Sequence, residues 1–360
     1  MSAGATQVAE ARTTFHPLAV AAVERLTDDA AAVSFVVPPE LAEAYAFAPG
    51  QAVVLRRTIE GVEHRRHYSI CAPAGAPLRI GVREVPDGLF SRWLVHDLRP
   101  GDLVEVATPT GSFHADPEEG GRHLCIAAGS GITPMLSIAT SVLATPSSQV
   151  TLLYGNRTTS TVMFADELSD LKNVHPARFE LVHVLSREPR DVELFTGRLD
   201  AERLRRILTT LVPIDVDHVW LCGPFAMLAD ARAVLGELGI PADRVHVELF
   251  YVDEPPPPVH HADRVVEGIT SEVAVMLDGR LTTTAVPRDR RILDAVQEVR
   301  SDLPFACKGG VCGTCRARVV EGEVEMVRNY ALEPDEVERG FVLTCQSLPV
   351  SDRVGVDFDA

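Results

Sequence analysis

Cysteine is scarce in this chain of 360 residues, and its seven cysteines are unevenly placed. Cys71, Cys125 and Cys222 stand alone, whereas the other four gather near the C-terminus. A small disulfide-bonded scaffold spreads its cysteines along a short secreted chain. The sequence therefore argues against a disulfide framework. The N-terminal segment has neither an apolar core nor a cleavage signal, so we expect a cytoplasmic protein.

Positive charge is also in short supply, with 34 Lys and Arg against 51 Asp and Glu and a formal net charge of −17. Nucleic acids and anionic membrane surfaces attract basic proteins, so neither is an expected partner. The apolar stretch 125–144 approaches the length of a membrane span. However, Gly129, Gly131 and Pro134 interrupt it. This pattern favours a strand, a glycine turn and a buried helix, and we expect no transmembrane segment.

The four gathered cysteines follow the pattern C-x4-C-x2-C, with a single cysteine after 29 intervening residues. This is the plant-type [2Fe–2S] spacing, whereas structural zinc sites usually pair their ligands. Gly309, Gly310 and Gly313 let the backbone approach a cluster closely and adopt positive φ angles. We therefore predict a [2Fe–2S] cluster, with a zinc site as the alternative. The predicted ligands are Cys307, Cys312, Cys315 and Cys345.

The pattern along the chain changes twice, and its length suggests roughly two or three domains. Short β-branched runs separated by Pro and Gly predict an antiparallel barrel at 16–118. Strands that alternate with helical stretches predict a parallel α/β domain at 119–252. The four prolines at 255–258 predict an extended linker at 253–262. Residues 263–360 then form the cysteine-containing domain, and residues 1–15 form a flexible tail.

Four short motifs in the first two domains could bind cofactors. "RHYS" at 66–69 lies on a barrel strand, and "GLFS" at 88–91 can open a helix whose free N–H groups face an anion. "GSGITP" at 129–134 is a glycine-rich turn between a strand and a helix, a form that binds phosphates. "SR" at 186–187 ends a strand and could take a 2′-phosphate. Taken singly, each motif could equally be an ordinary turn or surface segment.

The order of these motifs, followed by "CGP" and "ELF", resembles the ferredoxin–NADP reductase superfamily over residues 16–251. The C-terminal cysteines complete the flavin, nicotinamide and [2Fe–2S] order of oxygenase reductases. "CKGGVCGTC", "NYALEPDEV", "YGNR" and the "VDFDA" ending most resemble the reductase components of phenylacetyl-CoA epoxidases. Ketosteroid-hydroxylase reductases are similar in layout. The resemblance implies an FAD-binding β-barrel, an NADPH-binding α/β domain and a β-grasp ferredoxin domain.

The resemblance also implies roles for individual residues. Ser69, Cys222 and Glu248 match residues beside the reacting flavin and nicotinamide rings. Flavin binding is implied for Arg66, Tyr68, Ser69, Val82, Arg83 and the loop Gly88, Leu89, Phe90 and Ser91. Nucleotide binding is implied for Thr133, Arg157, Ser186 and Arg187. Phe250 matches an aromatic residue near the flavin, although here the chain continues beyond it.

A nicotinamide donates two electrons at once, a [2Fe–2S] cluster accepts one, and a flavin can do both. The resemblance therefore implies a reductase that passes electrons from NADPH through FAD and the cluster to a di-iron oxygenase acting on phenylacetyl-CoA. We expect no binding site for the aromatic substrate in this chain. A stand-alone flavin diaphorase and a non-catalytic zinc module are the alternatives. The stretch 321–338 carries seven carboxylates against one Arg, and it is either a solvated face or a docking surface for the oxygenase.

Overall fold

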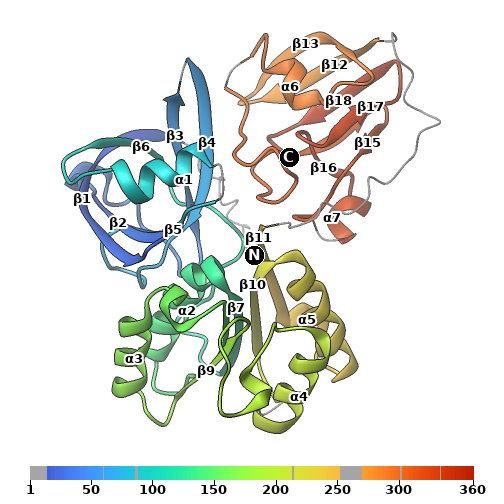
Figure 1. Ribbon diagram of the computed structural model, residues 1–360. Helices are drawn as coiled ribbons and strands as arrows, with labels where there is room; N and C mark the ends of the chain where they lie inside the picture. The colour runs from blue at the N-terminus through green and yellow to red at the C-terminus, as the bar shows by residue number, and fades with distance from the viewer. Residues whose placement is uncertain are drawn as a thin grey trace, which may run out of the picture.

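The computed structural model describes residues 14–59, 61–85, 88–212, 215–251, 270–300, 302–332 and 334–360. Most of the predicted tail, the whole predicted linker and the first residues of the predicted third domain lie outside the described residues. Figure 1 shows three groups of elements, coloured blue to cyan, green to yellow and orange to red. The three corresponding sheets span 15–107, 122–251 and 270–357. The predicted domain boundaries themselves stay a prediction.

The first group is an antiparallel barrel with the strand order β4-β3-β6-β1-β2-β5. An antiparallel bridge between Ile70 and Ile80 joins the two ends of this order and closes the barrel. The first strand already begins at Phe15, because Phe15 pairs with Ala107. The elements are β1 (Phe15–Thr27), β2 (Ala30–Val36), β3 (Ala52–Ile59), β4 (Val62–Ser69), β5 (Arg79–Arg83), α1 (Leu89–Arg92) and β6 (Leu103–Ala107).

The second group is a five-stranded parallel sheet with the order β11-β10-β7-β8-β9. Helices α2 and α3 cover one face of this sheet, and α4 and α5 cover the other (Figure 1). Both faces are therefore buried, which explains the nearly continuous apolar strands of the sequence. The strands are β7 (Arg122–Ala128), β8 (Gln149–Asn156), β9 (Phe179–Leu185), β10 (His218–Pro224) and β11 (Val245–Tyr251). The helices are α2 (Ile132–Leu143), α3 (Ala165–Val174), α4 (Ala201–Leu211) and α5 (Phe225–Glu237).

The third group is a mixed sheet with the order β13-β12-β18-β14-β16, in which β12 and β18 are parallel. A separate two-stranded ribbon joins β15 and β17. The helix α6 packs its apolar side into the core of this domain. The elements are β12 (Thr270–Leu277), β13 (Arg280–Pro287), α6 (Ile292–Val296), β14 (Arg316–Glu321), β15 (Val324–Met326), α7 (Pro334–Glu338), β16 (Phe341–Leu343), β17 (Ser347–Pro349) and β18 (Arg353–Asp357).

These three sheets confirm the predicted fold class. The apolar stretch 125–144 forms β7, a glycine turn at 129–131 and the buried helix α2, as its sequence predicts. Within the described part of the chain, the helices are too short or too polar to cross a membrane.

Candidate cofactor cleft

A cleft of about 2120 Å³ is lined by residues of all three domains. It exceeds the roughly 300–1,000 Å³ of a pocket for one drug-sized ligand, so it has room for more than one cofactor. Most of the residues predicted from the sequence line it. They are Arg66, Tyr68, Ser69, Arg83, Gly88, Phe90, Ser91, Arg157, Ser186, Arg187, Glu248, Phe250, Cys307 and Cys312.

The barrel and the parallel α/β domain meet in this cleft at Ser69 and Glu248. The Ser69 hydroxyl donates a hydrogen bond of 3.1 Å to Oε2 of Glu248. Burial raises the pKa of Glu248 to about 8, and the hydrogen bond from Ser69 only partly opposes this. Glu248 therefore holds a proton at neutral pH, at the point where strands β4 and β11 approach each other.

Cys222 lies behind Glu248, since the two residues are direct neighbours on the parallel strands β10 and β11. Its side chain is fully buried. Burial, together with the charge that Glu248 can carry, raises the pKa of the Cys222 thiol. The thiol is therefore neutral and packs behind the cleft, and it does not line the cleft itself.

The barrel wall of the cleft carries two aromatic rings. Tyr68 and Phe90 have ring centroids 6.2 Å apart, and burial raises the pKa of the Tyr68 hydroxyl. The neighbouring Arg66 is exposed, and its Nη1 donates to the carbonyl of Arg65 at 2.7 Å. An apolar wall beside an available guanidinium suits a ligand with a flat ring system and an anionic group.

The turn that leads into α1 closes tightly around Ser91. Its hydroxyl accepts from the Val85 N–H at 3.0 Å and donates to the Gly88 carbonyl at 3.2 Å. A Cβ atom at Gly88 would lie 2.6 Å from the Ser91 oxygen, so only glycine fits there. Gly88, Phe90 and Ser91 of this turn line the cleft, whereas the Leu89 side chain is 63% exposed and does not line it.

The glycine turn between β7 and α2 forms the facing wall. Gly129 has a φ of +57°, which glycine adopts without strain, and a Cβ atom there would lie 3.2 Å from Nη1 of Arg83. Like Cys222, the predicted residues Thr133 and Val82 lie behind the cleft wall. Both are fully buried and do not line the cleft. Thr133 packs against Gly81: a Cβ atom added at Gly81 would collide with the methyl group of Thr133.

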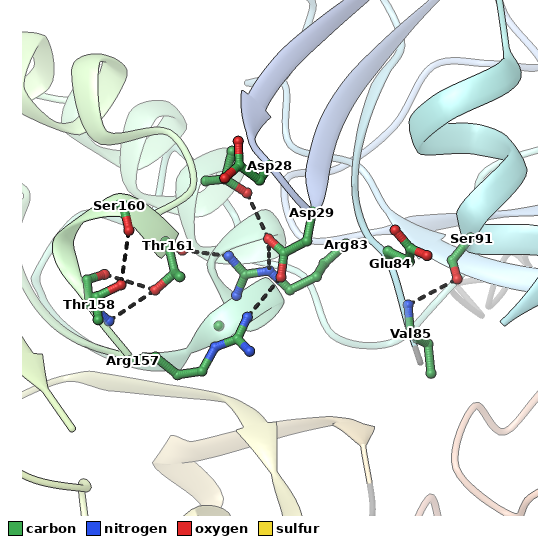
Figure 2. Close-up of polar contacts among 12 residues, drawn as sticks. Asp28, Asp29, Arg83, Glu84, Val85, Ser91, Arg157, Thr158, Ser160 and Thr161 are labelled. Carbon is green, nitrogen blue, oxygen red and sulfur yellow. Dashed lines mark hydrogen bonds and ion pairs between the residues drawn. The ribbon is translucent and has the colours of Figure 1, made fainter. Parts of the chain in front are cut away.

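Asp29 stands between two arginines beside this turn, as Figure 2 shows. Arg157 Nη2 donates to Asp29 Oδ2 at 2.7 Å, and Arg83 Nε lies 3.3 Å from Asp29 Oδ1. Burial raises the pKa of Asp29, but the hydrogen bond from Thr27 and the two guanidinium charges outweigh it and leave this pKa below its ordinary value.

Two guanidinium groups against one carboxylate leave a net positive charge at the ends of strands β5 and β8. The Nε of Arg83 is buried, and although it lies 3.3 Å from the Asp29 carboxylate it makes no hydrogen bond among the described residues. Such a donor beside a glycine turn suits a phosphate oxygen. The arrangement therefore fits the phosphates of a nucleotide cofactor.

Ser186 and Arg187 extend this positive region along the sheet edge. The N–H groups of Ser186 and Arg187 donate to the carbonyls of Asn156 and Arg157, at 2.9 and 2.8 Å. The ends of β8 and β9 are thus held together, and the exposed side chain of Arg187 adjoins Arg157. The carboxyl ends of parallel strands are the usual ligand-binding edge of such a sheet.

The four clustered cysteines form two interacting pairs, Cys307 with Cys312 and Cys315 with Cys345. The hydrogen bond from Cys312, helped by backbone N–H groups, lowers the pKa of Cys307 although burial opposes this, and the pKa of the Cys312 thiol is raised in turn. The hydrogen bond from Cys315 likewise lowers the pKa of Cys345. Thiolates are the form of cysteine that binds metal.

Further donors point at these sulfur atoms. The Gly309 N–H lies 3.3 Å from Cys307 Sγ, and the Thr314 hydroxyl lies 3.2 Å from Cys312 Sγ. Gly310 and Gly313 adopt the positive φ angles of +79° and +67°. Two thiol pairs with hydrogen-bond donors suit a cluster of two irons held by four cysteines. No three His, Cys, Asp or Glu side chains of the described residues converge on a single ion position.

Asp29 and Arg65 are among the cleft residues that the sequence analysis missed. Asp29 follows a strand in "TDD" and looks like any turn residue. Arg65 precedes the "RHYS" motif, and it is 7% exposed whereas Arg66 is exposed. Strand alternation separates the two arginines onto opposite faces. Arg65 is buried because Phe15 and Phe305, which are distant in the sequence, cover its side of the strand.

Comparisons with known families match three domains in sequence order. Residues 17–115 match the oxidoreductase FAD-binding domain, 125–233 the oxidoreductase NAD-binding domain, and 275–350 the 2Fe-2S iron-sulfur cluster binding domain. Together with the cleft, these matches define the class of protein: an NAD(P)H-dependent oxidoreductase with FAD and a [2Fe–2S] cluster.

Two relatives narrow this class. One of the subunits of 1,2-phenylacetyl-CoA epoxidase from Escherichia coli strain K12 is 44% identical, over 97% of this chain and 99% of the relative. The ferredoxin reductase component of 3-ketosteroid-9-alpha-monooxygenase from Rhodococcus rhodochrous is 33% identical, over 95% and 96%. The chain belongs to their family, the FAD- and [2Fe–2S]-containing reductase components of multicomponent oxygenases within the ferredoxin–NADP reductase superfamily.

A solved structure with the same three-domain fold is phthalate dioxygenase reductase. It superposes with a TM-score of 0.60 at 24% identity and covers 96% of this chain and 98% of its own. The likeness extends over all three domains and thereby supports the fold of the whole chain.

Proposed function

We propose that this protein is the NADPH-dependent reductase component of a di-iron oxygenase that epoxidises phenylacetyl-CoA. The observation that carries the proposal is the 44% identity with the epoxidase subunit, which runs over nearly the full length of both chains. When bound, FAD takes a hydride from the nicotinamide and the [2Fe–2S] cluster takes single electrons, which is chemistry that the cofactors supply.

The chain's own residues bind and orient these groups. Arg66, with the Gly88–Ser91 turn, would hold the flavin, while Ser69 and Glu248 keep one proton beside the reacting rings. Arg83, Arg157 and the glycine turn would hold the nucleotide phosphates. Cys307, Cys312, Cys315 and Cys345 would hold the cluster. The cytoplasmic location predicted from the sequence stays a prediction.

The preference for NADPH over NADH rests on Ser186 and Arg187. A 2′-phosphate distinguishes the two nucleotides, and a guanidinium binds phosphate with two parallel hydrogen bonds. The Arg187 side chain is exposed at the edge of the cleft, so its donors are accessible to a ligand.

Kinetics with both nucleotides test this preference. The unmodified protein should show a higher kcat/KM for NADPH, and Arg187→Ala should raise the KM for NADPH while barely changing that for NADH. Arg190→Ala is the matched control, because Arg190 is an exposed arginine of the same loop that does not line the cleft. Equal kcat/KM values for both nucleotides in the unmodified protein would refute the preference.

Reconstitution tests the partner. The reductase, NADPH and a purified phenylacetyl-CoA epoxidase oxygenase should form epoxide at a rate that depends on the reductase concentration. A ketosteroid oxygenase supplied in the same way should turn over far more slowly. The second candidate function, a ketosteroid reductase, is favoured by the 33% identity to that relative, and the opposite ranking of the two oxygenases would select it.

A further inference from the structure

The loop that carries the first cluster cysteine lies directly against the flavin-binding barrel. Ala306 is 2% exposed and packs with Val54 and Ala107, two residues of the barrel. Phe15 and Cys312 lie at the edge of this same apolar contact. The segment before Cys307 is therefore anchored by the barrel as well as by its own domain.

Arg65 reaches across this contact. Its guanidinium carbon lies 5.2 Å from the ring centroid of Phe15 in the barrel and 4.4 Å from that of Phe305 in the ferredoxin domain. Arg65 is 7% exposed, and its Nε binds Oε1 of Glu63 at 2.8 Å. A cation that contacts one ring from each domain is attracted to both.

Phe305 is held from its own domain as well. It packs into the core around α6, and Lys308 Nζ lies 4.7 Å from its ring centroid. Lys308 is itself fixed by Asp294 at 2.9 Å and Gln297 at 2.7 Å. Phe305 is thus a rigid point of attachment, only two positions before the predicted ligand Cys307.

We propose that Arg65 is a positioning residue that clasps Phe305 and so holds the cluster-binding loop against the flavin barrel. The inference rests on the proposed assignment of the cluster ligands. Each hydride brings two electrons, which pass one at a time from the barrel to the ferredoxin domain, and the Arg65–Phe305 contact holds these two domains together. Arg65 therefore governs the passage of electrons from the barrel to the ferredoxin domain and has no part in hydride transfer.

The test compares Arg65→Ala with Arg57→Ala in the full-length protein loaded with both cofactors. Arg57 is the matched control, because its guanidinium lies 4.1 Å from the Trp93 ring and so makes the same type of contact within the barrel. Removing a cation–π contact should lower the equilibrium constant for docking by roughly 2- to 30-fold. Arg57→Ala should leave it unchanged.

Two measurements report on docking. Amide hydrogen exchange over residues 302–307 should lose protection in Arg65→Ala by this factor and keep it in Arg57→Ala. In anaerobic rapid mixing with NADPH, bleaching of the flavin should keep its normal rate while reduction of the cluster slows. No oxygenase is present in either measurement, so failure of this inference is distinguishable from a wrong oxygenase assignment.

Three results would overturn the proposal. The first is unchanged exchange and unchanged cluster reduction in Arg65→Ala. The second is equal slowing of flavin and cluster reduction, and the third is loss of FAD from the variant, both of which would make Arg65 a part of the flavin site. If Arg65→Ala does not fold, Phe305→Leu removes the same cation–π contact from the side of the ferredoxin domain. It should then slow cluster reduction alone, and a normal rate in that variant overturns the proposal.

Discussion

Replacing Glu248 by glutamine should remove a pH dependence of the nucleotide-binding domain's stability. The pKa of Glu248 is raised from the ordinary 4.5 to about 8 by burial in the cleft. An unfolded chain releases this proton above pH 4.5, whereas the folded protein keeps it up to about pH 8. The contribution of Glu248 to stability is therefore fully present below pH 4.5 and is lost as the pH rises towards 8.

The magnitude follows from the size of the shift. Each pH unit between these two values lowers the unfolding free energy by about 1.4 kcal/mol, to a total of at most about 5 kcal/mol. Glutamine has nearly the same shape, and its carbonyl oxygen can still accept the hydrogen bond from Ser69. Glu248→Gln should therefore match the unmodified protein near pH 5 and be more stable than it at pH 8 and above.

Urea unfolding between pH 5 and 9 measures this difference. The chain has two tryptophans, and Trp220 lies on β10 beside the strand that carries Glu248. A Trp93→Phe background makes its fluorescence report on this domain alone. Glu180→Gln, on an exposed position of β9, is the control and should follow the unmodified protein. Identical pH profiles for Glu248→Gln and the unmodified protein would refute the reasoning.

Three further predictions concern the cofactors and the partner. Arg66→Ala should weaken FAD binding roughly ten- to a hundredfold, since a hydrogen bond from a charged group contributes about 1.5–3 kcal/mol. The flavin content after dialysis measures this loss, and full flavin occupancy of the variant would contradict the prediction. Cys312→Ser should lose the cluster and keep FAD, and an unchanged iron content would show that the ligand assignment is wrong. Electron delivery to the oxygenase should slow with rising salt more than ferricyanide reduction does, because acidic residues near the cluster steer a basic partner. Of these acidic residues, Asp335 and Glu336 pair with Arg339 and Arg316, and Glu333 lies outside the described residues. An equal salt dependence of both rates would show that the acidic stretch 321–338 is a solvated face and not a docking surface.

Local motifs explain why much of the fold and site could be predicted. The cysteine spacing lies within one loop plus one strand end, and the glycine turns at 88 and 129 need glycine for reasons of local geometry. The parallel sheet follows from alternating apolar strands and helices. In each case the residues that determine the structure are close in sequence, so the pattern contains the necessary information.

Contacts between distant segments explain what the sequence analysis missed. Asp29 is part of the site because Arg83 and Arg157, which are distant from it in the sequence, both reach it. Arg65 is buried because Phe305 covers it. Neither the sequence around Arg65 nor that around Phe305 contains the information that the two domains pack together here. Thr133 shows a different case: its methyl group packs against Gly81 in the structure, and the nucleotide contact that its motif suggests stays a prediction.

The central claim is that electrons pass from NADPH to FAD and only then to the [2Fe–2S] cluster. Anaerobic rapid mixing of the oxidised protein with NADPH, followed at wavelengths that separate flavin from cluster, tests it most directly. We expect the flavin to bleach first and the cluster afterwards, with no cluster reduction in protein from which FAD has been removed. Cluster reduction by NADPH without FAD, or a cluster that stays oxidised beside reduced flavin in the fully loaded protein, would contradict the account.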